Sequence, residues 1–226
     1  MLNNSLLNLF FPDVCQACQL QLNDNEKHIC TTCRHALPLT NFHITNSNFV
    51  VNLFYGRAKV EFGTALLRFE KKGIVQQLIH QLKYKEQEQI GTLLGEWLGA
   101  ELRKNENYKT IDIVIPVPLH KKKLRSRGYN QVAKFGQAIA AALNAKYIDT
   151  VLIKETNTTS QVSKKRFARW DGENDLFTIK NEEKIKGKNI LLVDDIITTG
   201  ATLEACMQEL NKANNIKISI ATMAIA

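Results

Sequence analysis

The sequence has no long apolar run and few glycines, prolines and cysteines. No stretch approaches the about 18 consecutive apolar residues of a membrane-spanning helix, so none is expected. With 11 Gly and 4 Pro in 226 residues, a collagen-like or low-complexity chain is excluded. Five cysteines are too few for a disulfide scaffold at this length. The 44% of hydrophobic residues is enough for an ordinary folded core.

The start of the chain also lacks the features of a secretory signal peptide. Its apolar residues, from Leu2 to Phe10, fall on one face of a short helix that ends before Pro12. No Lys or Arg precedes them, and no small-residue cleavage site follows. We therefore expect this helix to pack on the main body, and the protein to be cytoplasmic. A membrane-surface anchor is the weaker alternative, because the polar face lacks cations.

Four of the five cysteines form two Cys-x-x-Cys pairs, Cys15 with Cys18 and Cys30 with Cys33. Zinc prefers four soft ligands in tetrahedral geometry, and each pair supplies two thiolates from a tight turn. We therefore predict a structural zinc ribbon of about residues 12–40, which is too small to fold without its metal, within an N-terminal module of residues 1–44. Two disulfides would require an oxidising compartment, and redox catalysis would require a thioredoxin-like βαβ pattern around one pair.

Residues 45–226 are predicted to form one α/β domain. The expected strands are residues 49–55, 64–69, 111–115, 151–154, 189–193 and 217–224, and the expected helices are residues 74–82, 93–102, 128–143 and 202–213. Strands that alternate with helices of this length predict a three-layer domain with a mostly parallel sheet. Ligands of such sheets bind at the carboxyl ends of the strands, so the loops there matter most.

The formal net charge of +8 is unevenly distributed. Residues 111–170 carry 12 basic and 3 acidic side chains, which gives 12 − 3 = +9, whereas residues 171–226 carry 6 and 9, which gives −3. Part of the excess lies in two clusters, one at residues 121–127 and one at residues 164–169. This pattern predicts a cationic surface for an anionic partner such as phosphates or nucleic acid. A solvated basic face without a partner is the plainer alternative.

Residues 190–202 join an apolar strand, two carboxylates and a turn rich in Thr and Gly. The backbone N–H groups of such a turn, with a helix N-terminus behind it, form a nest for a phosphate, and Gly200 permits the backbone it needs. Asp194 and Asp195 would repel an anion unless its ligand also offers hydroxyls or a divalent metal. A ribose 5-phosphate meets that description. The plainer alternative is a surface Asp pair before a helix cap, and no Walker A or Gly-x-Gly-x-x-Gly loop is present.

This string resembles the binding motif for phosphoribosyl pyrophosphate (PRPP) in type I phosphoribosyltransferases. More narrowly, essentially the whole chain resembles the ComF family of competence-associated phosphoribosyltransferase-like proteins. The resemblance rests on the N-terminal helix, the two Cys-x-x-Cys pairs, residues 115–120 and 125–131, Thr159 and Gln161 with Arg166, and the Asp-Asp string. It implies the type I phosphoribosyltransferase fold behind a small zinc ribbon.

The resemblance also implies a set of site residues. Asp194 and Asp195 would be the catalytic pair and hold the ribose hydroxyls, directly or with Mg²⁺. The implied substrate-binding residues are Ile197, Thr198, Thr199, Gly200, Ala201, Thr202, His120, Lys121, Arg125, Arg127, Lys164, Lys165 and Arg166. The first six would hold the 5-phosphate, and the cations would offset the charge that develops on pyrophosphate.

The function implied by the resemblance is binding of PRPP, or of a related phosphorylated sugar, in a protein of DNA uptake during natural competence. Single-stranded DNA and other DNA-uptake proteins are the implied partners. An active phosphoribosyltransferase of nucleotide metabolism, a non-catalytic DNA-binding module and a scaffold for partner proteins are the alternatives. Residues 116–120 replace the small glycine-containing pyrophosphate loop of salvage enzymes, so the sequence leaves open whether the chain turns over PRPP.

Overall fold

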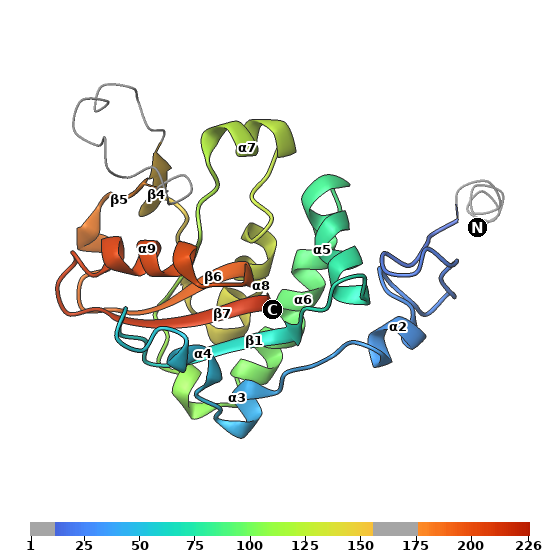
Figure 1. The fold of residues 1–226 in the computed structure, drawn as a ribbon, viewed down its shortest axis with the longest axis horizontal. Coiled ribbons are helices and arrows are strands. Elements are labelled where there is room, and N and C mark those ends of the chain that lie inside the picture. The colour runs from blue at the N-terminus through green and yellow to red at the C-terminus, as the bar shows by residue number, and fades with distance from the viewer. Residues whose placement is uncertain (1–11, 156–175) are drawn as a thin grey trace.

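The computed structural model describes residues 12–155 and 176–226, and Figure 1 shows a parallel sheet at its centre. The strand order is β1-β7-β6-β2-β3, and each neighbouring pair is parallel. The strands are β1 (Gly63–Arg68), β2 (Ile113–Pro116), β3 (Lys146–Tyr147), β6 (Asn189–Ile197) and β7 (Lys217–Ile225). The expected parallel α/β sheet is therefore confirmed, and β6 lies in the middle of it.

Helices cover both faces of this sheet and complete three layers. The helices α5 (Ile74–Tyr84), α6 (Gln89–Leu102) and α8 (Ala133–Leu143) lie over one face, and α9 (Ala201–Leu210) lies over the other. The strand β6 serves both cores, because successive side chains of a strand point to opposite faces. Leu191 and Val193 join the cluster under α5, α6 and α8, whereas Ile190 and Leu192 join the cluster under α9.

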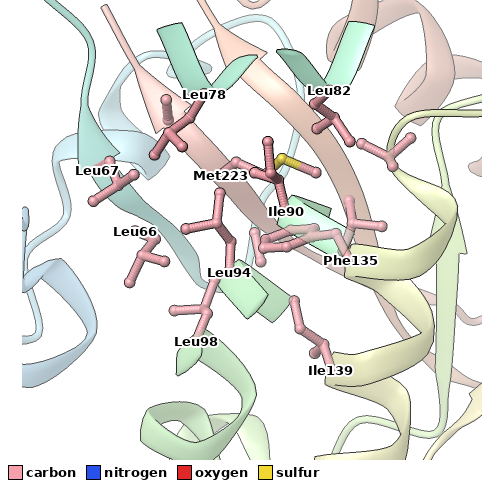
Figure 2. Close-up of a cluster of buried hydrophobic side chains, with 14 of the residues drawn as sticks. Leu66, Leu67, Leu78, Leu82, Ile90, Leu94, Leu98, Phe135, Ile139 and Met223 are labelled. Atoms are coloured by element: carbon pink, nitrogen blue, oxygen red, sulfur yellow. The ribbon is translucent and has the colours of Figure 1, made fainter. Parts of the chain in front are cut away.

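Figure 2 shows side chains of the cluster between the sheet and the helices α5, α6 and α8. Side chains from α5, α6 and α8 converge on Met223 of β7 and on the leucines of β1. The helices α6 and α8 approach each other through small residues. A Cβ at Gly95 would lie 2.6 Å from the carbonyl oxygen of Phe135, so this crossing requires glycine.

The cysteine module packs onto the same cluster. It contains α2 (Thr31–His35), and the buried Cys15 and Cys33 belong to the cluster that includes α5 and α6. The guanidinium of Arg34 lies 5.1 Å from the ring centre of Trp97 on α6, in cation–π geometry. The boundary at residue 44 between two domains stays a prediction.

Two predicted elements differ in the structure. Residues 49–55 form the helix α4 (Phe49–Asn52) and a turn instead of a strand. The segment is rich in β-branched and aromatic residues, but Val50 and Phe54 are both buried and stand four residues apart, which is the spacing of a helix. The helix expected over residues 128–143 begins only at Ala133. Gly128 has φ +79° and ends a separate helix, α7 (Lys121–Arg127), which the sequence did not reveal.

The remaining elements are short. The strands β4 (Leu152–Glu155) and β5 (Leu176–Ile179) form an antiparallel pair, of which only the first was predicted. Besides these there are α3 (Phe42–Thr45) and the 3-10 turns η1 (Glu106–Tyr108) and η3 (Glu182–Lys184). No helix within residues 12–155 and 176–226 has both the length and the apolarity to span a bilayer. The predicted helix of residues 2–10 lies outside the described residues.

Candidate functional site

The four cysteines of the N-terminal module lie together. Their Sγ atoms are all within 4.8 Å of one another, and those of Cys18 and Cys30 are 3.8 Å apart. A tetrahedron with metal–sulfur bonds of ~2.3 Å has edges of roughly 3.8 Å. The backbone N–H of Cys30 donates to Cys15 Sγ at 3.3 Å, and that of Cys33 donates to Cys30 Sγ at 3.4 Å. This donor set fits a structural zinc ion, and none of the five cysteines forms a disulfide.

The two predicted carboxylates lie inside β6 near its carboxyl end. The strand continues through Asp194 and Asp195 to Ile197, whereas it was expected to end before them. The residues are 9% and 5% exposed, and Asp194 Oδ1 accepts the backbone N–H of Asp195 at 2.8 Å. Both line a cavity of about 300 Å³. Carboxylate oxygens are the ligands that Mg²⁺ prefers, so this pair has the chemistry to hold a magnesium ion or a diol.

Asp195 has two donors from other parts of the chain. Lys83 Nζ in the last turn of α5 lies 2.8 Å from Asp195 Oδ2. The side-chain amide of Gln131, just before α8, donates to the same oxygen at 2.8 Å. Gln131 also accepts a hydrogen bond from Arg127 Nη1 at 3.0 Å. A helix outside the predicted motif therefore provides a positive charge in direct contact with Asp195.

The environment of Asp194 favours its neutral form. Burial, together with the negative charge of Asp195, raises the pKa of Asp194 to about 8. The hydrogen bond from the backbone of Asp195 and the charges of Lys83 and Lys154 act in the opposite direction. A cation or hydroxyl groups in the cavity would offset the same repulsion.

The turn after β6 leads directly into α9. Thr198 and Thr199 are exposed, and Gly200 has φ +80° at the cap of the helix. The segment that follows α4 contacts this turn and α9 through Arg57. Arg57 Nη1 pairs with Glu204 Oε2 at 3.0 Å and lies 3.4 Å from the carbonyl oxygen of Thr199.

The opposite wall of the cavity is formed by residues 117–120 and by α7, which Figure 1 shows projecting beyond the sheet. His120 caps α7, since its Nδ1 accepts the backbone N–H of Lys122 at 3.2 Å. Arg127 is the last residue of α7, and its guanidinium lies 5.2 Å from the ring centre of Tyr84. The hydroxyl of Tyr129 donates to the carbonyl oxygen of Leu82, and its ring packs on the core.

The structure brings together only part of the predicted site. The predicted residues that line the cavity are Asp194, Asp195, Thr198, Thr202, His120 and Arg127. Thr199, Gly200 and Ala201 belong to the same turn but do not line it, and Ile197 packs in the core. Lys121 and Arg125 are exposed on α7 away from the lining. Lys164, Lys165 and Arg166 lie outside the described residues.

Four polar residues line the cavity without having been predicted as site residues: Lys83, Lys123, Gln131 and Lys154. Lys123 belongs to the basic cluster of residues 121–127, and Gln131 ends the segment 125–131, so both carried a signal in the sequence. Lys83 and Lys154 carried none, because neither belongs to a motif.

Comparisons with known proteins agree with this geometry. Residues 132–225 match the model of the phosphoribosyl transferase domain family. The chain is 33% identical over 121 residues to competence protein ComFC of Streptococcus pneumoniae, which covers 54% of this chain and 50% of that protein. It is 28% identical over 154 residues to competence protein F of Haemophilus influenzae, covering 66% and 67%.

Two further similarities complete the comparison. DNA utilization protein YhgH of Escherichia coli O157:H7 is 27% identical over 135 residues, and the match spans 58% of each protein, less than two thirds of that relative. A purine phosphoribosyltransferase structure from Pyrococcus horikoshii is 22% identical, with 60% of this chain and 73% of that one covered and a TM-score of 0.39.

The parallel sheet agrees with the match of residues 132–225 to the phosphoribosyl transferase domain family, and the matched part contains the acid pair and the turn after it. The similarity extends to particular relatives, and the resemblance to the ComF family is confirmed. The chain is a homologue of competence protein F and ComFC with a four-cysteine cluster at its N-terminal side.

Proposed function

We propose that this protein binds PRPP, with Mg²⁺, in the cavity at the carboxyl end of β6. One observation carries the proposal: a buried acid pair and a Thr/Gly turn share one cavity with the cations Lys83, Lys123 and Arg127. Carboxylates suit the sugar hydroxyls and a divalent cation, whereas the turn and the cations suit phosphate groups. A ligand that carries a diol at one end and phosphates at both sides matches this distribution.

Within this proposal each part of the site has a role. Asp194 and Asp195 hold the ribose hydroxyls, directly or with Mg²⁺. The turn of residues 197–202 holds the 5-phosphate, mainly through its backbone and through the hydroxyls of Thr198 and Thr202. His120, Lys123 and Arg127 lie on the side of the pyrophosphate, with Lys164, Lys165 and Arg166 as further proposed contacts.

The biological role that we propose follows from the relatives, two of which are named as competence proteins. The protein acts in the cytoplasm in the uptake or use of DNA, with other DNA-uptake proteins as partners. If it is also a phosphoribosyltransferase, a nitrogen nucleophile attacks C1 of PRPP and pyrophosphate leaves with the electrons of the broken C–O bond. Release of pyrophosphate in the presence of a panel of nitrogenous bases tests this transferase activity.

Titration calorimetry with PRPP and Mg²⁺ tests the binding proposal. The wild type is compared with the double variant Asp194→Asn/Asp195→Asn, which we expect to lose binding by at least about tenfold. The matched control is Glu182→Gln/Glu183→Gln, which makes the same change of charge at two exposed neighbours in η3. Absence of a binding signal in the wild type, or equal loss in the control, would refute the proposal.

A second candidate function is binding of single-stranded DNA along α7. It is favoured by Lys121, Lys122 and Arg125, which are exposed on α7 and do not line the cavity. A protein that neutralises several DNA phosphates loses affinity steeply as salt rises. We expect a triple substitution of these residues to Gln to reduce the salt dependence of binding to a labelled single strand, without changing PRPP affinity. A flat salt response in the wild type would contradict this second function.

A further inference from the structure

The last turn of α5 places a lysine directly on the acid pair. Lys83 Nζ lies 2.8 Å from Asp195 Oδ2, and the two side chains are 20% and 7% exposed. The neighbouring Leu82 is fully buried, which anchors this end of the helix on the core. Lys83 lies well outside residues 132–225, the part of the chain that matches the phosphoribosyl transferase domain. A separate element therefore supplies this contact.

The contact compensates charge in a place where charge is strongly unfavourable. Two consecutive carboxylates are buried here, and burial of an unpaired charge is among the most destabilising features of a protein. Among the described residues, Asp195 Oδ2 contacts the ammonium of Lys83 and receives a hydrogen bond from the neutral amide of Gln131. Asp194 receives the backbone N–H of Asp195. Within residues 12–155 and 176–226, Lys83 is a cation in direct contact with the pair, through its ion pair with Asp195.

A phosphorylated sugar that arrives with a divalent cation changes this balance. The metal and the sugar hydroxyls then bind the carboxylates, so that the carboxylate of Asp195 is no longer the one partner of the Lys83 ammonium. Lys83 lines the same cavity as Lys123 and Arg127, which lie where the proposed function puts phosphate oxygens. The lysine ammonium is a compact charge on a flexible stem of four carbons, so it can change partners by rotating that stem.

We propose that Lys83 is an exchangeable counter-ion: it neutralises Asp195 in the ligand-free protein and moves to the phosphate oxygens of a metal-bearing phosphosugar when this ligand binds. The move of Lys83 to phosphate oxygens rests on the proposed function, whereas its pairing with Asp195 before the ligand binds does not. Lys83 then opposes binding of a metal alone and supports binding of the metal together with the phosphosugar. A purely structural lysine would not have these opposite effects.

The first measurement uses Mn²⁺ alone as a probe, with free Mn²⁺ followed by electron paramagnetic resonance in the absence of any phosphosugar. Lys83→Gln keeps a polar side chain with the same number of heavy atoms but removes its charge. We expect this variant to bind Mn²⁺ about tenfold more tightly than the wild type at the acid pair. In an Asp195→Asn background, the same Lys83→Gln change should have no further effect. Equal Mn²⁺ affinity of wild type and Lys83→Gln, or no binding by either, would overturn the proposal.

The second measurement is calorimetry of PRPP with saturating Mg²⁺ on the same full-length proteins. We expect Lys83→Gln to bind PRPP about tenfold more weakly than the wild type, in spite of its stronger hold on the metal. Unchanged or increased PRPP affinity would overturn the exchange. If the wild type does not bind PRPP at all, the proposed function and the second half of the exchange both fail. The Mn²⁺ result then still decides whether Lys83 is the counter-ion of Asp195.

The matched control is Lys85→Gln, which removes the same charge from an exposed position two residues further along. It should change neither affinity. Lys83→Arg provides a second test if Lys83→Gln folds poorly, since it retains the charge but has a bulkier, planar head group. We expect Lys83→Arg to bind Mn²⁺ as weakly as the wild type. Stronger Mn²⁺ binding by Lys83→Arg would contradict a role for the charge.

Discussion

The ring of Phe54 lies against Gly200, so that a Cβ added to Gly200 would come within 2.9 Å of Phe54 Cε1. Phe54 is fully buried, and Gly200 has φ +80°, a conformation that residues with a side chain rarely adopt. The turn of residues 198–202 thus packs on a residue from the segment before β1. The surface on which the turn packs is therefore formed by a buried side chain from outside residues 190–202.

Gly200→Ala should therefore both destabilise the protein and weaken PRPP binding. The positive φ costs about 1–2 kcal/mol for any residue with a Cβ, and the clash with Phe54 adds about 1–3 kcal/mol. Gly187→Ala is the matched control, because Gly187 has φ +70° but nothing lies within 4 Å of its added Cβ. Urea denaturation should show the larger loss for Gly200→Ala, and calorimetry should show weaker PRPP binding only for that variant. Equal destabilisation by both variants would mean that the ring of Phe54 moves aside for the added Cβ, so that no clash remains.

Arg57 should act as a positioning residue for the same turn. Its guanidinium joins Glu204 of α9 to the carbonyl oxygen of Thr199, and it lies over the ring of Phe54. Because Arg57 is partly exposed, Arg57→Ala should cost no more than about 1 kcal/mol of stability. It should still lower PRPP affinity by roughly three- to tenfold, since the turn loses its clamp.

Two variants sharpen this prediction. Arg57→Lys keeps a charge for Glu204 but loses the planar group that reaches Thr199, so its PRPP affinity should be intermediate. Lys59→Ala removes the cation of the exposed Lys59–Glu61 pair and should leave PRPP affinity unchanged. A loss of stability in Arg57→Ala as large as its loss in binding energy would identify Arg57 as merely structural.

Removal of zinc should destabilise more than the N-terminal module. Cys15 and Cys33 belong to the buried cluster that includes α5 and α6, so loss of the metal exposes part of the main core. We expect one zinc ion per chain by elemental analysis, and a lower melting temperature after chelation or in Cys18→Ser. Cys206→Ala, which changes a buried cysteine of α9 outside the cluster, should retain the full zinc content. A melting temperature unaffected by chelation would contradict this coupling.

The stability of the ligand-free protein should fall as pH rises from about 4 to about 8. The pKa of Asp194 is raised from 3.8 to about 8, so in this window the folded state binds a proton that the unfolded state has released. The free energy of unfolding therefore decreases with pH across it. Asp194→Asn removes this dependence, and its stability relative to the wild type should increase between pH 5 and pH 8 in urea denaturation. Parallel pH profiles for the two proteins would show that Asp194 stays ionised.

The features that could be predicted from the sequence are those that lie within short segments. The functional side chains of each cysteine pair and of residues 190–202 lie within a few positions of one another in the sequence. The parallel sheet was indicated by hydrophobic patterns in the same way. Lys83 could not be predicted, because its role arises from a contact with Asp195 across the fold. In residues 49–55, β propensity favoured a strand, whereas burial of Val50 and Phe54 on one side requires a helix and turn.

The central claim is that PRPP binds at the carboxyl end of β6, and a crystal structure of the protein grown with PRPP and Mg²⁺ tests it most directly. We predict the 5-phosphate in the turn of residues 198–202, the ribose hydroxyls at Asp194 and Asp195, and Lys83 turned from Asp195 toward phosphate oxygens. PRPP bound elsewhere, or an empty cavity with Lys83 still on Asp195 at saturating PRPP, would contradict the account.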